Sequence, residues 1–183
     1  MIVRFFALLT TGALIFWVNA LSAAELNAAG LWQQFDDVSG KSEGWFLISE
    51  HDGIYEGAIA KMFMKPGENP NPICEHCEGG EKNSPWLGLT IIKGMKRNGM
   101  NYEDGTILDP RNGIVYKAVM ELSPDEQTLT VRGYLGIRLL GRDQVWKRLP
   151  DSAQAELDPA LRLKYEMSKP STTRKPTTHP LNH

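Results

Sequence analysis

From residue 30 to about residue 150, apolar and polar side chains alternate over short segments, and helical periodicity is weak. A repeat of two residues is typical of β-strands that bury one face. In one segment Tyr116, Ala118 and Met120 share a face, while Lys117 and Glu121 lie on the opposite one. The pattern predicts eight strands, which cover Leu31–Phe35, Gly44–Glu50, Gly53–Met64, Leu87–Lys93, Asn101–Leu108, Gly113–Leu122, Gln127–Leu135 and Gln144–Leu149.

Most connections between these segments are short and contain the residues that tight turns require. Gly, Pro, Asn or Asp occurs in each of the stretches 51–53, 109–113 and 123–126. Strands joined in this way pair with their neighbours in antiparallel fashion, and no helix is predicted between them. We therefore expect an all-β fold, a single antiparallel up-and-down barrel of about eight strands. A sandwich of two sheets is the alternative arrangement of the same strands.

Two stretches depart from this pattern. Residues 65–86 contain four prolines, three glycines and both cysteines, and loops of this length inside a compact domain are often functional. Near the C-terminus, Asp158 and Pro159 suit the N-cap and first turn of a short helix that ends near Met167. Residues 168–183 are rich in Pro, Thr and Lys, a composition typical of a flexible, disordered tail.

The first 24 residues have the order of a secretory signal peptide. Arg4 supplies a positive start, residues 5–20 are almost entirely apolar, and small residues at Ser22, Ala23 and Ala24 form a cleavage step. The apolar run is shorter than the about 20 residues of a transmembrane helix, and an uncleaved anchor is the alternative. We expect residues 1–24 to be removed, residues 25–150 to form the barrel domain, and residues 151–183 to form the short helix and flexible tail.

Charge and its distribution narrow the range of partners. The chain carries 20 basic and 22 acidic side chains, and no cluster of Lys and Arg is present. This pattern argues against nucleic-acid binding, which needs a basic surface. The chain also contains no amphipathic basic helix of the kind that lies on anionic membranes. No stable membrane insertion is therefore expected after signal cleavage.

Cys74 and Cys77 frame the most specific local motif, Cys-Glu-His-Cys. An exported chain meets an oxidising compartment, which favours a structural disulfide between them. Closing so short a loop stabilises the fold by only about 2 kcal/mol. A redox-active pair is disfavoured because Glu75 and Glu78 oppose a thiolate. Two further interpretations stay open, a pair of free thiols and a zinc or copper site that uses Cys74, His76 and Cys77 but lacks a fourth ligand.

Catalytic groups are not indicated by the sequence. Glu103, Asp104 and Asp109 have the chemistry for acid–base work or calcium binding, but Asp before Gly or Pro is typical of turns. No serine lies in a nucleophile elbow, and His51 lies in a predicted turn. We therefore expect no enzymatic activity, no catalytic residue and no cofactor.

Gly30-Leu31-Trp32 opens the first strand, and Arg148 closes the last one. The first motif resembles the Gly-x-Trp signature of the lipocalins and the wider calycin barrels. The resemblance implies that Trp32 packs across the barrel floor beneath Arg148 in a cation–π contact, with Arg132 as the other candidate. A core tryptophan at the start of a strand is the alternative interpretation.

Several motifs together make the chain similar to an uncharacterised family of exported bacterial proteins, domain of unknown function 2147. They are Gly30-Leu31-Trp32, Ile54-Tyr55-Glu56-Gly57, Cys74-x-x-Cys77, Gly105 to Pro110 with Tyr116, Arg132 to Gly136, and Trp146-Lys147-Arg148. The resemblance spans about residues 29–149 and implies a small β domain in the periplasm of a Gram-negative bacterium. It brings no established reaction.

For function, the sequence favours a non-enzymatic protein that binds a small apolar molecule in a barrel cavity with few ionisable groups. An eight-stranded barrel has room either for a solid core or for one small ligand. One alternative is a structural or interaction protein of the cell envelope with a solid core, and another is metal binding through the cysteine loop. The candidate cavity lining consists of Tyr55, Tyr116, Met120, Leu129 and Val131.

Overall fold

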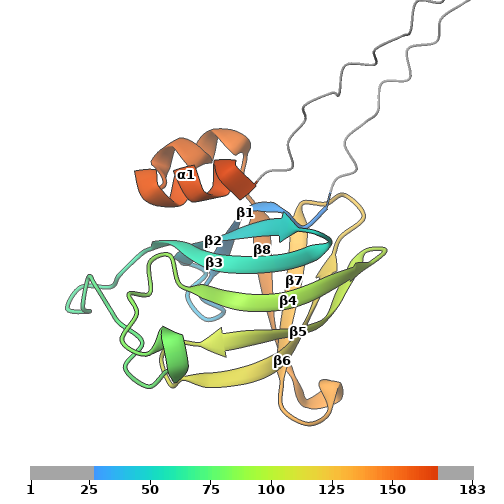
Figure 1. Ribbon diagram of the computed structural model, residues 1–183, viewed down its shortest axis with the longest axis horizontal. Helices are drawn as coiled ribbons and strands as arrows, with labels where there is room; N and C mark the ends of the chain where they lie inside the picture. Colours follow the sequence, from blue (N-terminus) through green and yellow to red (C-terminus); the bar gives the residue numbers. More distant parts are fainter. Residues whose placement is uncertain (1–26, 169–183) are drawn as a thin grey trace, which may run out of the picture.

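The computed structural model describes residues 27–168, so the predicted signal peptide and the predicted tail from residue 169 onward lie outside the described residues. Eight strands follow one another in chain order and close into a barrel, because β8 pairs with β1 (Figure 1). The predicted antiparallel up-and-down barrel is confirmed, and the two-sheet sandwich is excluded. The strands are β1 (Gly30–Phe35), β2 (Ser42–His51), β3 (Ile54–Met62), β4 (Thr90–Asn98), β5 (Asn101–Asp109), β6 (Ile114–Leu122), β7 (Thr128–Tyr134) and β8 (Arg142–Arg148).

The largest boundary difference from the sequence prediction concerns β4. The predicted strand ends at Lys93, just before a glycine, whereas β4 continues through Gly94 to Asn98. Gly94 has a φ of 72°, a conformation that glycine adopts without strain. Pairing with β5 keeps its register across this position, while the pairing with β3 shifts nearby. Gly94 therefore marks an irregularity inside a strand and not its end.

The up-and-down order gives the barrel two distinct ends. The β1–β2, β3–β4, β5–β6 and β7–β8 connections lie at one end, which we call the open end. The β2–β3, β4–β5 and β6–β7 turns and the segment before β1 lie at the other, which we call the closed end. Long connections are confined to the open end, where β3 and β4 are joined through residues 63–89, including the short 3-10 helix η1 (Gly79–Glu81).

The closed half of the barrel is filled by large apolar side chains. Trp32, Met95, Tyr102, Met120 and Leu129 are all fully buried there. Packing is tight enough to exclude a side chain at residue 105, where a Cβ would overlap the Met95 sulfur. Close packing of this kind is characteristic of protein interiors.

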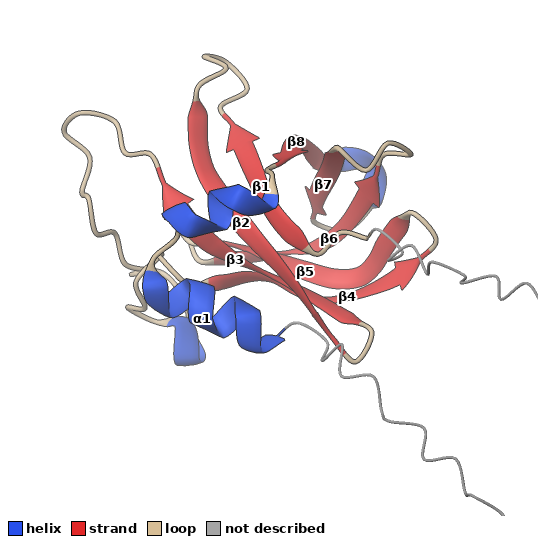
Figure 2. Ribbon diagram, turned by 90° about the horizontal axis from the view of Figure 1, so that it is seen from above, coloured by secondary structure: helices blue, strands red, loops and turns tan. Residues whose placement is uncertain are grey.

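A second apolar cluster lies outside the barrel wall. The 3-10 helix η3 (Asp151–Glu156) and the α-helix α1 (Pro159–Ser168) follow β8 and lie against the outer side of the first strands (Figures 1 and 2). The short C-terminal helix begins as predicted, since the Asp158 carboxylate accepts a hydrogen bond from the Ala160 backbone N–H at 2.9 Å. The apolar members of this cluster are Leu31, Trp45, Leu47, Ala60, Ala153 and Leu157.

Candidate functional site

A cavity of about 700 Å³ occupies the open half of the barrel. Its inner walls are aromatic and aliphatic. Phe46 on β2 stacks on Trp146 of β8, with ring centroids 4.3 Å apart and an angle of 13° between the planes. Further walls come from the neighbouring strands and from the β3–β4 connection, and consist of Ile59, Ile91, Ile107, Val131 and Trp86. The volume lies within the range of small-molecule sites, and the lining is of the apolar kind such sites have.

Polar and charged side chains surround this apolar interior. Gln34 donates a hydrogen bond to Glu43 at 3.0 Å, and Gln144 on β8 also lines the cavity. The cationic side chains of Lys61, Lys65, Arg111 and Arg142 and the carboxylates of Glu68 and Asp109 also contribute. The cavity therefore has more ionisable groups than the sequence suggested. The reason is positional, because strand ends and connections supply the rim while strand centres supply the walls.

Several rim charges are already paired with each other or with neighbours. Arg111 donates two hydrogen bonds to the Asp109 carboxylate, both at 2.9 Å. Burial works against the charged form of Asp109, but the hydrogen bonds from Arg111 outweigh it and lower the pKa of this carboxyl. Arg142 forms an ion pair with Asp37 at 2.9 Å. At the rim, Arg111 thus holds the Asp109 carboxyl in its ionised form, while Arg142 and Asp37 form an exposed pair.

The five side chains predicted to line a cavity fall into two sets. Tyr116 and Val131 line the cavity. Tyr55, Met120 and Leu129 are instead buried in the packed core, and Tyr55 packs edge-on against Tyr102 with centroids 4.8 Å apart. Burial raises the pKa of both tyrosines. Alternation placed these five side chains on inward faces, but it does not say how far along the barrel axis a residue lies.

The closed end is held by one arginine that the sequence singled out. The guanidinium of Arg148 lies over the ring of Trp32, 4.3 Å from its centroid. Arg148 also donates hydrogen bonds to three backbone carbonyls, those of Asn27 at 2.6 Å, Ala29 at 2.9 Å and Glu126 at 2.7 Å. Together these contacts tie the segment before β1 to the β6–β7 turn.

Two further hydrogen bonds complete this end of the barrel. The Trp32 indole N–H donates to the Ala28 carbonyl at 2.8 Å, and the Ala28 N–H donates to the Tyr102 hydroxyl at 2.8 Å. Arg132, the other candidate for the contact with Trp32, instead forms an ion pair with Asp143 on the next strand. The residues from Asn27 to Trp32 and their partners thus close the barrel opposite the cavity.

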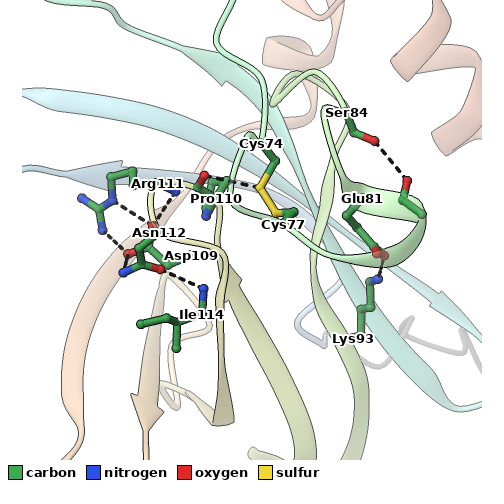
Figure 3. The surroundings of a disulfide bond; sticks show 11 residues. Cys74, Cys77, Glu81, Ser84, Lys93, Asp109, Pro110, Arg111, Asn112 and Ile114 are labelled. Carbon is green, nitrogen blue, oxygen red and sulfur yellow. Dashed lines mark hydrogen bonds and ion pairs between the residues drawn. A yellow bond between two sulfur atoms is a disulfide. The ribbon is translucent and has the colours of Figure 1, made fainter.

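Cys74 and Cys77 form a disulfide that is buried in the long β3–β4 connection (Figure 3). The Cys74 sulfur lies 3.3 Å from the Pro110 carbonyl oxygen, on the β5–β6 turn. Gly113 on the same turn packs so closely that a Cβ there would overlap the His76 carbonyl oxygen. Because Asp109, Pro110 and Arg111 line the cavity, the disulfide loop braces one side of its rim.

Other candidate chemistry from the sequence does not gather into one site. Within residues 27–168, no three His, Cys, Asp or Glu side chains come together in an arrangement that could hold a metal ion. Glu103 and Asp104 contact different cations, Arg138 at 3.8 Å and Lys96 at 3.5 Å. Asp104 lies inside β5 and not in a turn as predicted, with a φ of 63° where the β5–β6 register shifts.

Phe46 and Trp146, whose stacked rings form part of the cavity wall, were not among the lining residues that the sequence predicted. They are about a hundred positions apart, and their stacking follows from β8 lying beside β1 and β1 beside β2. Both occupy inward positions of their strands, so alternation combined with barrel closure was the available signal. In the described part of the chain, no helix has the length and apolar character needed to cross a membrane.

Known proteins with similar structure or sequence identify the fold and the family of this chain. A search of curated proteins gave no match. Among solved structures, protein HP1028 from the human pathogen Helicobacter pylori, which is described as belonging to the lipocalin family, is similar with a TM-score of 0.60. The two chains are 17% identical, and the similarity covers 75% of this chain and 96% of the other. At this identity the likeness shows a shared lipocalin-like barrel and no more.

The model of a family described as uncharacterised proteins conserved in bacteria (DUF2147) matches residues 30–148. This range runs from the first residue of β1 to the last residue of β8, so it contains the whole barrel. The chain therefore belongs to the DUF2147 family of uncharacterised bacterial proteins, as the motifs in its sequence indicated.

Proposed function

We propose that this protein is an exported, non-enzymatic binding protein that holds one small, mainly apolar molecule in the cavity at the open end of the barrel. The observation that supports it is the cavity itself, about 700 Å³ in volume and walled by Phe46, Trp146 and aliphatic side chains. A volume of this size accommodates one small molecule and leaves the opposite end of the barrel packed. The signal-like N-terminal sequence supports a periplasmic location.

The distribution of apolar and polar side chains in the lining indicates what kind of molecule the cavity suits. Tyr116 and Val131, which the sequence suggested, lie in the wall together with the Phe46–Trp146 stack. Gln34, Gln144 and the ionised rim groups lie toward the strand ends. A molecule with an apolar body and a polar group at one end suits this division, because the body displaces water from the walls while the polar group stays paired. A solid-core structural role fits this barrel less well.

The first test identifies what the protein carries. The protein is purified from its own bacterial host, its N-terminus is located by intact mass, and native mass spectrometry is followed by organic extraction. A co-purifying apolar molecule at near-unit stoichiometry supports the proposal. Absence of any bound molecule, together with failure to bind the fluorescent probe N-phenyl-1-naphthylamine, contradicts it and favours the structural or interaction role.

A matched pair of variants on β8 locates the binding. Gln144 lies on the inward side and lines the cavity, while the next residue, Val145, is exposed on the outer side. Gln144→Trp introduces a large ring into the cavity, and we expect it to weaken probe binding by at least about tenfold, equivalent to about 1.4 kcal/mol. Val145→Trp adds the same ring outside the wall and should leave probe binding unchanged. Equal effects of the two substitutions would place the probe elsewhere.

A further inference from the structure

The β7–β8 connection exposes an unusual concentration of aliphatic side chains. Residues 135–141, which we call the apolar loop, contain the 3-10 helix η2 (Arg138–Leu140) and project from the barrel (Figure 1). Leu135 is 59% exposed, Ile137 60%, Leu139 83% and Leu140 76%. Single exposed apolar residues are ordinary on protein surfaces, but four within six positions form a patch that indicates an interaction site.

Most of the other exposed apolar side chains also lie at the open end of the barrel. Of the twelve large apolar side chains that are exposed among the described residues, ten lie in or beside the open-end connections. Only Val145, on the outer face of β8, and Leu163, on α1, lie elsewhere. Outside the apolar loop, the open-end members are Val38, Phe63, Ile73, Leu87, Ile114 and Val115. The turns of the closed end contribute none of them.

The charges of the apolar loop are positive. Arg138 lies within it and Arg142 follows it, while residues 134–142 contain no carboxylate. Arg138 is paired with Glu103 at 3.8 Å and Arg142 with Asp37 at 2.9 Å, and all four side chains are substantially exposed. Exposed ion pairs of this kind contribute little to stability, so these arginines can exchange their partners for lipid phosphates at small cost.

The composition and position of the apolar loop fit a lipid surface better than a protein. Its apolar side chains are all Leu or Ile, without the aromatic anchors that dominate protein interfaces. It is a projecting connection and not a groove, and aliphatic side chains flanked by arginines are suited to the boundary between headgroups and acyl chains. Gly133 near the end of β7 and Arg142 at the start of β8 flank the loop and line the cavity, so a surface bound by the loop faces the cavity rim.

We propose that the apolar loop docks the open end of the barrel reversibly on an anionic lipid bilayer, with Leu139 and Leu140 entering the interface and Arg138 contacting lipid phosphates. This docking places the mouth of the cavity against the membrane, so the bound molecule can enter the cavity from the bilayer or leave it for the bilayer. It goes beyond the proposed function, because the loop contacts the bilayer whether or not the cavity is filled.

Sedimentation with vesicles tests the docking. The processed chain, with its N-terminus verified by intact mass, is mixed with vesicles of phosphatidylethanolamine and phosphatidylglycerol. We expect the double variant Leu139→Ser/Leu140→Ser to reduce partitioning by at least about tenfold, given about 0.8 kcal/mol for each buried CH₂ group. The matched control Val145→Ser/Leu163→Ser removes the same kind of group from other exposed sites and should partition normally. No partitioning by the unmodified chain, or equal partitioning by both variants, would overturn the proposal.

Two further measurements separate the bilayer from other occupants. Arg138→Gln should weaken binding to the anionic vesicles by about fivefold, from about 1 kcal/mol per arginine, and leave binding to phosphatidylcholine vesicles unchanged. Brominated lipids should quench the fluorescence of Leu139→Trp more than that of Leu163→Trp. Loop-dependent self-association without lipid, seen by sedimentation velocity, would replace the bilayer with a second copy of the chain. Gln144→Trp should retain vesicle binding while losing probe binding, so the two proposals fail independently.

Discussion

The two ends of this barrel use the same strands for different purposes. At the closed end, Arg148 satisfies three backbone carbonyls and covers Trp32, and the side chains behind it are fully buried. At the open end the inward face borders a cavity, and long connections expose aliphatic side chains. One end thus concentrates the contacts that hold the fold, and the other retains unfilled apolar surface. Substitutions of equal size should therefore have unequal effects at the two ends.

The largest expected difference concerns truncation of inward side chains. Leu129→Ala leaves a cavity in a fully packed region and should lower the free energy of unfolding by about 3 kcal/mol. Ile107→Ala removes a side chain that already borders the cavity, and its cost should be less than half as large. Urea unfolding followed by circular dichroism gives both values. Equal losses would mean that the open half is as tightly packed as the closed half in solution.

A second comparison sets one arginine against another. Arg148→Met leaves three carbonyls without their donor and should cost about 2–3 kcal/mol in unfolding free energy. Arg111→Met, at the open end, removes only a partly exposed pair with Asp109 and should cost less than about 1 kcal/mol. Arg148→Met should keep probe stoichiometry at one. Loss of binding without unfolding would show that the closed end also controls the cavity.

The disulfide connects stability with the shape of the open end. Replacing both Cys74 and Cys77 with serine should cost about 2 kcal/mol or less, because the loop that the bond closes is very short. Its structural effect should be local, since the disulfide loop packs on the turn that carries Asp109 and Arg111. Hydrogen exchange should quicken in residues 65–86 and 109–113 and stay unchanged at the closed end. Uniform acceleration over the barrel would contradict this division.

The smallest expected effect depends on pH. The pKa of Asp109 is lowered from its ordinary value of 3.8, so its ionised form stabilises the folded state above that value. The contribution disappears as the pH falls from the unfolded pKa through the lower folded one. The unmodified chain should therefore exceed Asp109→Asn in stability at pH 7, by less than about 1 kcal/mol after solvent screening, and the gap should close once the pH falls below the lowered pKa of the folded state. A gap that widens on acidification would mean that Asp109 is protonated in the folded protein.

The architecture was accessible from the sequence because its signals are local. Alternation and turn residues predicted eight strands and their antiparallel order, and the Gly-x-Trp motif led to the contact of Trp32 with Arg148. The position of each inward side chain along the barrel axis could not be predicted from the sequence. Leu129 and Val131 share the inward face of β7, yet Leu129 lies in the packed core and Val131 borders the cavity. The depth of each side chain depends on the register of β7 against all the other strands, which the sequence pattern does not give. The sequence pattern placed Leu135 at the end of a strand and indicated only a connection for the rest of the apolar loop, whereas β7 ends at Tyr134 and Leu135 is exposed.

Barrel closure also has a consequence for the order of folding. Every strand pairing except β1 with β8 joins strands that are consecutive in the sequence. The β1–β8 pairing cannot form until β8 is available, and Arg148 bonds to the Ala29 carbonyl across 119 positions. Contacts of such separation form late, because the loop entropy must be overcome first. Until β8 arrives, the edge of β1 is unpaired and open to pairing with other chains. Pairing of β8 with β1 is therefore the step that protects the sheet from aggregation. Slow synthesis or truncation of β8 should cause more misassembly than substitutions in the cavity do.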